Sequence, residues 1–147
     1  MRSTLREPVR LPLAGRMSPW DKGRLIAEIL RHYAPLLRAV RRDELVAVLA
    51  TARAQRGAGA AMLGAQEEHE TALRLGSIVA RVLKELPTDS RCLIQSVVLL
   101  RVLARRGIEA DLVIGIHDDG GFAAHAWVEH ERHALLPAGN FEQLTRL

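Results

Sequence analysis

The chain has 147 residues, of which 48% are hydrophobic, enough for one globular domain that buries roughly two-thirds of its unfolded surface. Its single cysteine, Cys92, excludes an internal disulfide, and it has no apolar run of about 18 residues that could span a membrane. We therefore expect a soluble, cytoplasmic protein.

Residues 1–56 carry 12 Lys and Arg against 5 Asp and Glu, which fits solvated helix faces or a surface for an acidic partner. One Tyr and two Phe leave little for stacking on bases, so we expect no nucleic-acid partner.

The first half of the chain is predicted to be helical after a basic arm. Residues 1–19 contain three prolines and a glycine, which suit an extended segment. Ser18-Pro19 then marks a helix start, with proline in the first turn, and Pro35 is expected to interrupt that helix. Further helices are predicted over residues 43–56 and 66–86, where apolar residues recur at helical spacing.

The next predicted helix, over residues 90–106, carries Cys92 at its start. It is apolar on nearly all sides, which predicts a buried helix. Arg105-Arg106-Gly107 closes it, with cations in the last turn and glycine just beyond.

After Gly107 the apolar pattern changes to a period of two, which is typical of strands. Strands are predicted over residues 108–116 and 122–129, joined by a polar, glycine-rich turn, with a third over about 133–137 after a turn at 130–132. The fold class is therefore α+β: a helical N-terminal half, then a buried helix packed on a small antiparallel sheet. We expect residues 20–147 to form one domain, with a helical part over 20–86 and a catalytic core over 87–147.

Cys92 and His125 carry the chemistry that this order of elements predicts. A helix N-terminus favours a thiolate, because its unpaired N–H groups and dipole attract negative charge. With Asp89 or Ser90 as the cap, the Cys92 N–H is also a candidate donor to an oxyanion. His125 lies on the strand face away from the apolar alanines and is the candidate base. Cysteine on a helix start followed by histidine on a strand is the order found in papain-like and transglutaminase-like enzymes.

The neighbours of His125 have different expected roles. Trp127 shares its strand face and either walls the substrate site or is a core tryptophan. Glu129 is about 13 Å further along the strand and should not orient the imidazole. His117, His130 and His133 fall in or beside turns, where we expect them to be solvated. One cysteine with scattered histidines predicts no metal site, and no cofactor is expected.

Three segments together resemble a known family. They are residues 87–96 (PTDSRCLIQS), residues 103–110 (LARRGIEA) leading to 113–116, and residues 122–129 (FAAHAWVE). In combination they are similar to the B2 leader peptidases of lasso-peptide biosynthesis and to the C-terminal domain of the microcin J25-processing protein, within the transglutaminase-like superfamily. The resemblance is close over about residues 87–137.

The resemblance implies a cysteine protease that removes the leader from a ribosomally made precursor, so that an ATP-dependent lasso cyclase can form the macrolactam. It also implies a separate leader-recognition protein, B1, for which the basic N-terminal half is a candidate docking surface. Acyl transfer by the same pair of residues, or a non-catalytic binding role, are the alternatives.

The third catalytic residue is where the chain departs from the family. A hairpin centred near Glu131 puts His125 opposite Pro137, which is also where the family has its aspartate by count. Asn140 is the candidate substitute, giving a Cys-His-Asn set. Otherwise a backbone carbonyl, Asp111 or Asp118 must hold the imidazole, or the enzyme works as a Cys-His dyad.

Overall fold

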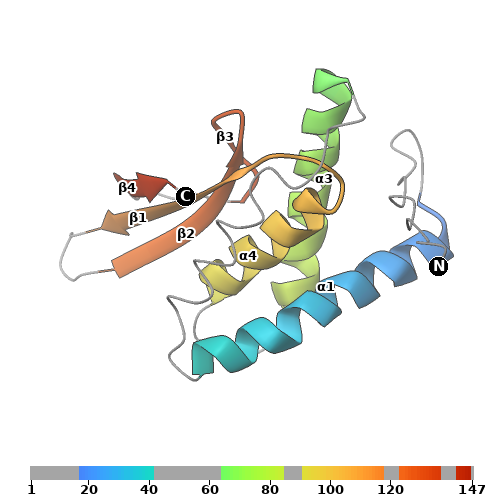
Figure 1. The fold of residues 1–147 in the computed structure, drawn as a ribbon, viewed down its shortest axis with the longest axis horizontal. Helices are drawn as coiled ribbons and strands as arrows, with labels where there is room; N and C mark the ends of the chain where they lie inside the picture. The colour runs from blue at the N-terminus through green and yellow to red at the C-terminus, as the bar shows by residue number, and fades with distance from the viewer. Residues whose placement is uncertain (1–16, 42–63, 85–90, 118–122, 137–141, 147) are drawn as a thin grey trace, which may run out of the picture.

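The described part of the protein is built around one central helix. The computed structural model describes residues 17–41, 64–84, 91–117, 123–136 and 142–146. In chain order these form helices α1 (Pro19–Arg41), α3 (Ala65–Lys84) and α4 (Arg91–Ala104) and strands β1 (Asp111–His117), β2 (Ala123–His130), β3 (His133–Ala134) and β4 (Glu142–Arg146). Helix α4 lies between α1 and the sheet, where it contacts β1 and β2 (Figure 1). Helix α3 packs beside α4 and against the end of the sheet at the β2–β3 hairpin. The predicted α+β class is thus confirmed, whereas the helix predicted over 43–56 lies outside the described residues.

Helix α1 begins where the sequence predicted but does not end there. Ser18 caps it, because the Asp21 amide donates to Ser18 Oγ at 3.1 Å. The helix continues through Pro35 to Arg41, so the predicted interruption at Pro35 is wrong. Pro35 lies on the exposed side of the helix, and buried side chains hold the chain on both sides of it. We attribute the continuation to this packing, which offsets the backbone hydrogen bond that proline removes.

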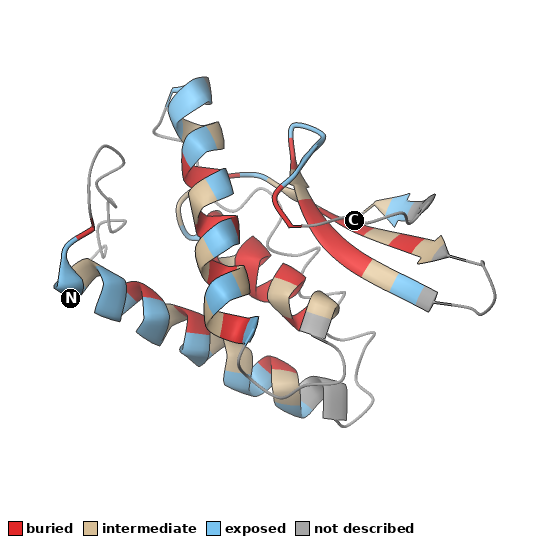
Figure 2. Cartoon of the chain, turned by 180° about the vertical axis from the view of Figure 1, so that it is seen from behind, coloured by how far each residue is buried: buried red, intermediate tan, exposed pale blue. Residues whose placement is uncertain are grey.

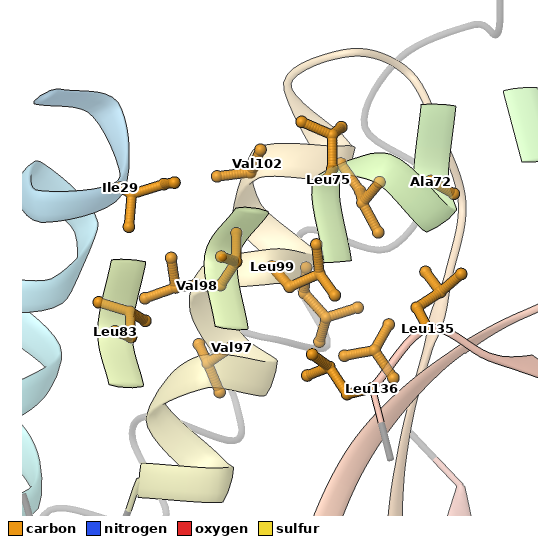
Figure 3. Packing of buried hydrophobic residues seen from close by; sticks show 14 of the residues in the cluster. Ile29, Ala72, Leu75, Leu83, Val97, Val98, Leu99, Val102, Leu135 and Leu136 are labelled. Atoms are coloured by element: carbon orange, nitrogen blue, oxygen red, sulfur yellow. The ribbon is translucent and has the colours of Figure 1, made fainter. Parts of the chain in front are cut away.

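The three helices share one apolar core, part of which Figure 3 shows. Each contributes a stripe of almost fully buried side chains: Leu25, Ile29 and Leu36 from α1; Ala72, Leu75, Val79 and Leu83 from α3; Ile94, Val97, Val98, Leu99, Val102 and Leu103 from α4. Helix α3 agrees with the predicted 66–86 to within two residues at each end. The outer side of α1, by contrast, is largely exposed (Figure 2).

The C-terminal end of α4 is fixed by a glycine and by an ion pair. Gly107 has a φ of 71°, and the Ile108 amide donates back to the Leu103 carbonyl at 3.0 Å, the pattern of a Schellman motif. The Arg106 guanidinium then donates to both carboxylate oxygens of Glu28 on α1, at 3.1 and 2.9 Å. This end of the helix is therefore tied to α1.

The sheet has four antiparallel strands in the order β3-β2-β1-β4. Strand β4 was not predicted, and β3 is shorter than the expected 133–137. The β2–β3 hairpin pairs His130 with His133, so its centre lies between Glu131 and Arg132, half a residue beyond the predicted one. Its two turn residues have positive φ, 49° and 66°, as two-residue hairpin turns require. None of the helices in the described part of the chain is both long and apolar enough to cross a membrane.

Candidate active site

Cys92 is the second residue of α4 and is half-buried. An α-helix leaves the amides of its first turn without partners inside the helix, so the Cys92 N–H belongs to this group. The carbonyl of Cys92 accepts a hydrogen bond from Ser96 Oγ, one turn further on, at 2.7 Å. The predicted caps, Asp89 and Ser90, lie outside the described residues. The expected position of the cysteine at the start of a buried helix is confirmed.

His125 is the third residue of β2 and is also half-buried. Its partner across the β1–β2 ladder is Gly115, which has no side chain to contact the imidazole. The ring of Trp127 stacks on the imidazole, with centroids 5.8 Å apart and planes inclined by 22°. Trp127 itself is only 3% exposed. Trp127 is therefore a core tryptophan that also lies against His125, and its role as a wall of the substrate site stays a prediction.

The two elements that carry these residues pack on each other. Helix α4 contacts β2 more extensively than it contacts β1. The N-terminal end of α4 and the first half of β2 lie at the same end of the molecule, away from the Gly107 turn (Figures 1 and 2). A cysteine at the start of α4 and a histidine near the start of β2 thus occupy one end of a helix-on-sheet layer. Their assignment as nucleophile and base stays a prediction.

This arrangement of helix and strand agrees with the comparison to known families. A model described as the transglutaminase-like superfamily core (Transglut_core3) matches residues 36–146, well over half of the chain. The chain belongs to the transglutaminase-like superfamily. No curated protein and no solved structure matches it significantly. Transglutaminase-like proteins include cysteine peptidases, and both Cys92 and His125 lie inside the matched segment.

In this transglutaminase-like protein, the indole next to His125 is anchored by an ion-pair network. Trp127 Nε1 donates to Glu129 Oε1 at 2.9 Å, and Arg146 on β4 donates to the other oxygen of that carboxylate and to Asp111. Burial on its own would raise the pKa of Glu129, but the hydrogen bonds from Trp127 and Arg146 and the nearby positive charge outweigh it and lower that pKa. Glu129 thus stays ionised and holds the Trp127 side chain.

Sequence reasoning missed Arg146 as a member of this network. It lies in a five-residue strand that pairs with β1 through an irregular register between Ile114 and Gly115. A strand this short, without an apolar alternation, has no sequence signal that distinguishes it from a loop. Only the pairing with β1 brings Arg146 next to Glu129.

The structure narrows the choice of a third catalytic residue. Asp111 lies opposite Glu129 in the ladder, four residues from the partner of His125, and its carboxylate pairs with Arg146. Asp111 is therefore excluded as the group that orients His125. Pro137, Asn140 and Asp118 lie outside the described residues, so Asn140 remains a prediction. The pairing of Pro137 with His125 likewise stays a prediction, because the observed β2–β3 ladder ends at the Glu129–Ala134 pair.

One expectation about the other histidines is wrong. His130 is not solvated but 2% exposed, because the end of β2 packs against α3 in the folded chain. Its two ring nitrogens contact His69 and Glu68, 61 and 62 residues away in the sequence. His133 is exposed, as expected.

Proposed function

We propose that this transglutaminase-like protein is a cysteine peptidase that removes the leader from a ribosomally made lasso-peptide precursor. The observation that carries the proposal is Cys92 in the first turn of a buried helix that packs on the strand of His125. The segments around these two residues, together with the RRGI sequence after α4, are the ones that resemble the lasso leader peptidases. Membership of the superfamily supports the chemistry, and the resemblance supports the substrate.

The proposed reaction uses the Cys92 thiolate as the nucleophile. His125 takes the thiol proton, the sulfur attacks the carbonyl carbon of the scissile bond, and the imidazolium then gives its proton to the leaving amine. That amine is the N-terminus of the core peptide. Water, deprotonated by His125, hydrolyses the thioester that links the leader to the enzyme. The Cys92 amide, at the positive end of the helix, would stabilise the oxyanion.

The partners in this proposal follow from the same resemblance. The leader would be presented by a separate leader-recognition protein, B1, and the freed core would pass to the ATP-dependent cyclase. The excess of Lys and Arg in residues 1–56 would favour an acidic surface on such a partner.

The decisive experiment is to incubate the protein with a precursor peptide from its own gene cluster, with and without B1, and to follow the products by mass spectrometry. We expect one cut between leader and core, and no cut by Cys92→Ala. This variant removes the nucleophile and costs little packing, because Cys92 is only half-buried; circular dichroism would verify its fold. Cleavage by folded Cys92→Ala at the wild-type rate would refute the cysteine-protease mechanism.

Product analysis also separates the other two possible functions. With an added primary amine, an acyltransferase would give a leader amide in place of the free leader acid. A non-catalytic binding protein would leave the precursor intact even with B1 present, and its Cys92 would react with iodoacetamide at about pH 6 no faster than a free thiol. Either result would replace the peptidase proposal.

A further inference from the structure

A second cluster of reactive side chains lies far from Cys92, where α3 meets the β2–β3 hairpin. His69 projects from α3, His130 ends β2, and Glu131 begins the hairpin turn. Each offers one ligand atom, and these atoms all lie within 4.8 Å of one another. His130 is five residues from His125, or about 16 Å along the strand. The cluster is therefore separate from the candidate active site.

The two imidazoles face each other with their Nδ1 atoms. His69 Nδ1 and His130 Nδ1 are 3.0 Å apart, and the ring centroids are 5.3 Å apart. Two nitrogen ligands of a tetrahedral zinc ion, each about 2.0–2.1 Å from the metal, lie about 3.3 Å apart. The observed separation needs to open by only a few tenths of an ångström to fit such an ion.

A carboxylate behind His130 already orients it as a ligand. His130 Nε2 lies 3.2 Å from Glu68 Oε1, so the Nε2–H donates to the carboxylate and the lone pair stays on Nδ1, facing His69. Metal-binding histidines almost always donate their second N–H to a carboxylate, carbonyl or water in this way. The side chain of His130 is 3% exposed and that of Glu68 17%, so the pair is shielded from water.

The hairpin turn supplies the third group in an unusual backbone conformation. Two-residue turns of this kind favour Asn and Gly, because both positions need a positive φ. This chain instead has Glu131 and Arg132 there, with φ of 49° and 66°. Residues held in the left-handed region without being glycine are concentrated at functional sites. Here the result is a carboxylate next to the two imidazoles.

We propose that His69, His130 and Glu131 bind one Zn²⁺ ion, with water in the remaining position. Two imidazole nitrogens and one carboxylate are a recognised ligand set for zinc. The ion would join α3 to the β2–β3 hairpin, which are distant in sequence, and would bind the folded chain only. His133, whose ring contacts His69 edge-on at 5.1 Å, lies beside the site but is not one of its ligands.

The test is calorimetric titration of metal-free protein with ZnCl₂ in a Cys92→Ala background, which removes the only thiol that could compete for zinc. We expect one ion per chain and a rise in the midpoint of thermal unfolding that EDTA reverses. His69→Gln and Glu131→Gln should each weaken binding at least about tenfold, and Glu68→Gln by about 10- to 100-fold. These three residues are less buried than His130, so the variants test the site even where His130→Gln fails to fold.

The matched control is Glu70→Gln, which makes the same change as Glu68→Gln two residues along α3. Glu70 is exposed and bonds to Gln66, so Zn²⁺ affinity should stay within about threefold of the parent, well below the effect of losing a group behind a ligand. Absence of a one-to-one zinc complex would overturn the proposal. So would a complex whose affinity is equal in the parent, His69→Gln and Glu68→Gln.

Discussion

Gly76 on α3 tests how closely that helix approaches the chain after β3. A Cβ atom at this position would lie 2.6 Å from the Leu135 carbonyl oxygen and 3.3 Å from the Leu135 carbonyl carbon and Cβ. The nearest of these atoms belong to the backbone, so no side-chain rotation relieves the contact. Leu135 cannot easily move away either, because its amide donates to the Val128 carbonyl on β2 at 2.8 Å. Gly76→Ala should therefore push α3 and the sheet apart.

The size of the effect follows from two opposing contributions. Replacing glycine by alanine inside a helix stabilises it by about 1 kcal/mol, whereas overpacking a well-packed contact costs about 1–3 kcal/mol. Gly23 on α1 provides the control, because a Cβ there meets nothing within 4 Å. The helix contribution is common to both variants and cancels. We expect Gly76→Ala to be less stable than Gly23→Ala by about 1–3 kcal/mol.

Urea unfolding followed by circular dichroism measures this difference, provided that the slope of the transition is the same in both variants. Gly23→Ala should exceed the wild type in stability, and Gly76→Ala should fall below Gly23→Ala. Equal stability of the two variants would show that α3 does not press on Leu135 as described, and the close approach would have to be rejected.

Three further predictions concern single side chains. His125→Ala should reduce leader cleavage at least about 100-fold because it removes the general base, whereas His133→Ala should be mild; a comparable loss in both would contradict the assignment of His125. Trp127→Phe keeps an aromatic ring beside His125 but removes the hydrogen bond to Glu129, so the free energy of unfolding in urea should fall by about 1–3 kcal/mol; no change would show that this bond contributes nothing. Burial, followed by the charge of Arg101, lowers the pKa of His32 from its ordinary 6.5. The unfolded chain therefore binds this proton at higher pH than the folded chain does, so stability falls as the pH decreases through 6.5. In urea titrations between about pH 7.5 and about pH 5.5, the free energy of unfolding of His32→Gln should fall less with decreasing pH than that of the wild type. An equal fall in both proteins would refute the assignment of this pH dependence to His32.

The elements that the sequence predicted well are those whose signal is local. The apolar period located α3 and α4, and Gly107 located the end of α4, because a helix end needs a residue that tolerates a positive φ. The alternation after Gly107 located β1 and β2 and put His125 and Trp127 on one face, where their rings stack. The position of Cys92 at the start of a helix could likewise be predicted, because a proline and candidate capping residues precede it in the sequence.

The features that were missed depend on contacts between distant residues. Pro35 is compatible with α1 only because buried side chains hold both halves of the helix. Strand β4 exists because β1 has a free edge for it to pair with. The contact of His69 with His130 joins residues 61 positions apart. The sequence pattern of a single segment cannot predict these contacts between residues that are distant in the chain.

The position of α1 has a consequence for the length of chain that folds as one unit. The superfamily match begins at residue 36, yet Leu25 and Ile29 of α1 are 2% and 0% exposed and Glu28 pairs with Arg106 at the end of α4. A chain trimmed to the shared segment would uncover the apolar side of its own central helix. Helix α1 therefore belongs to the folding unit of this chain, and a fragment that begins at residue 36 should be less stable than the full chain.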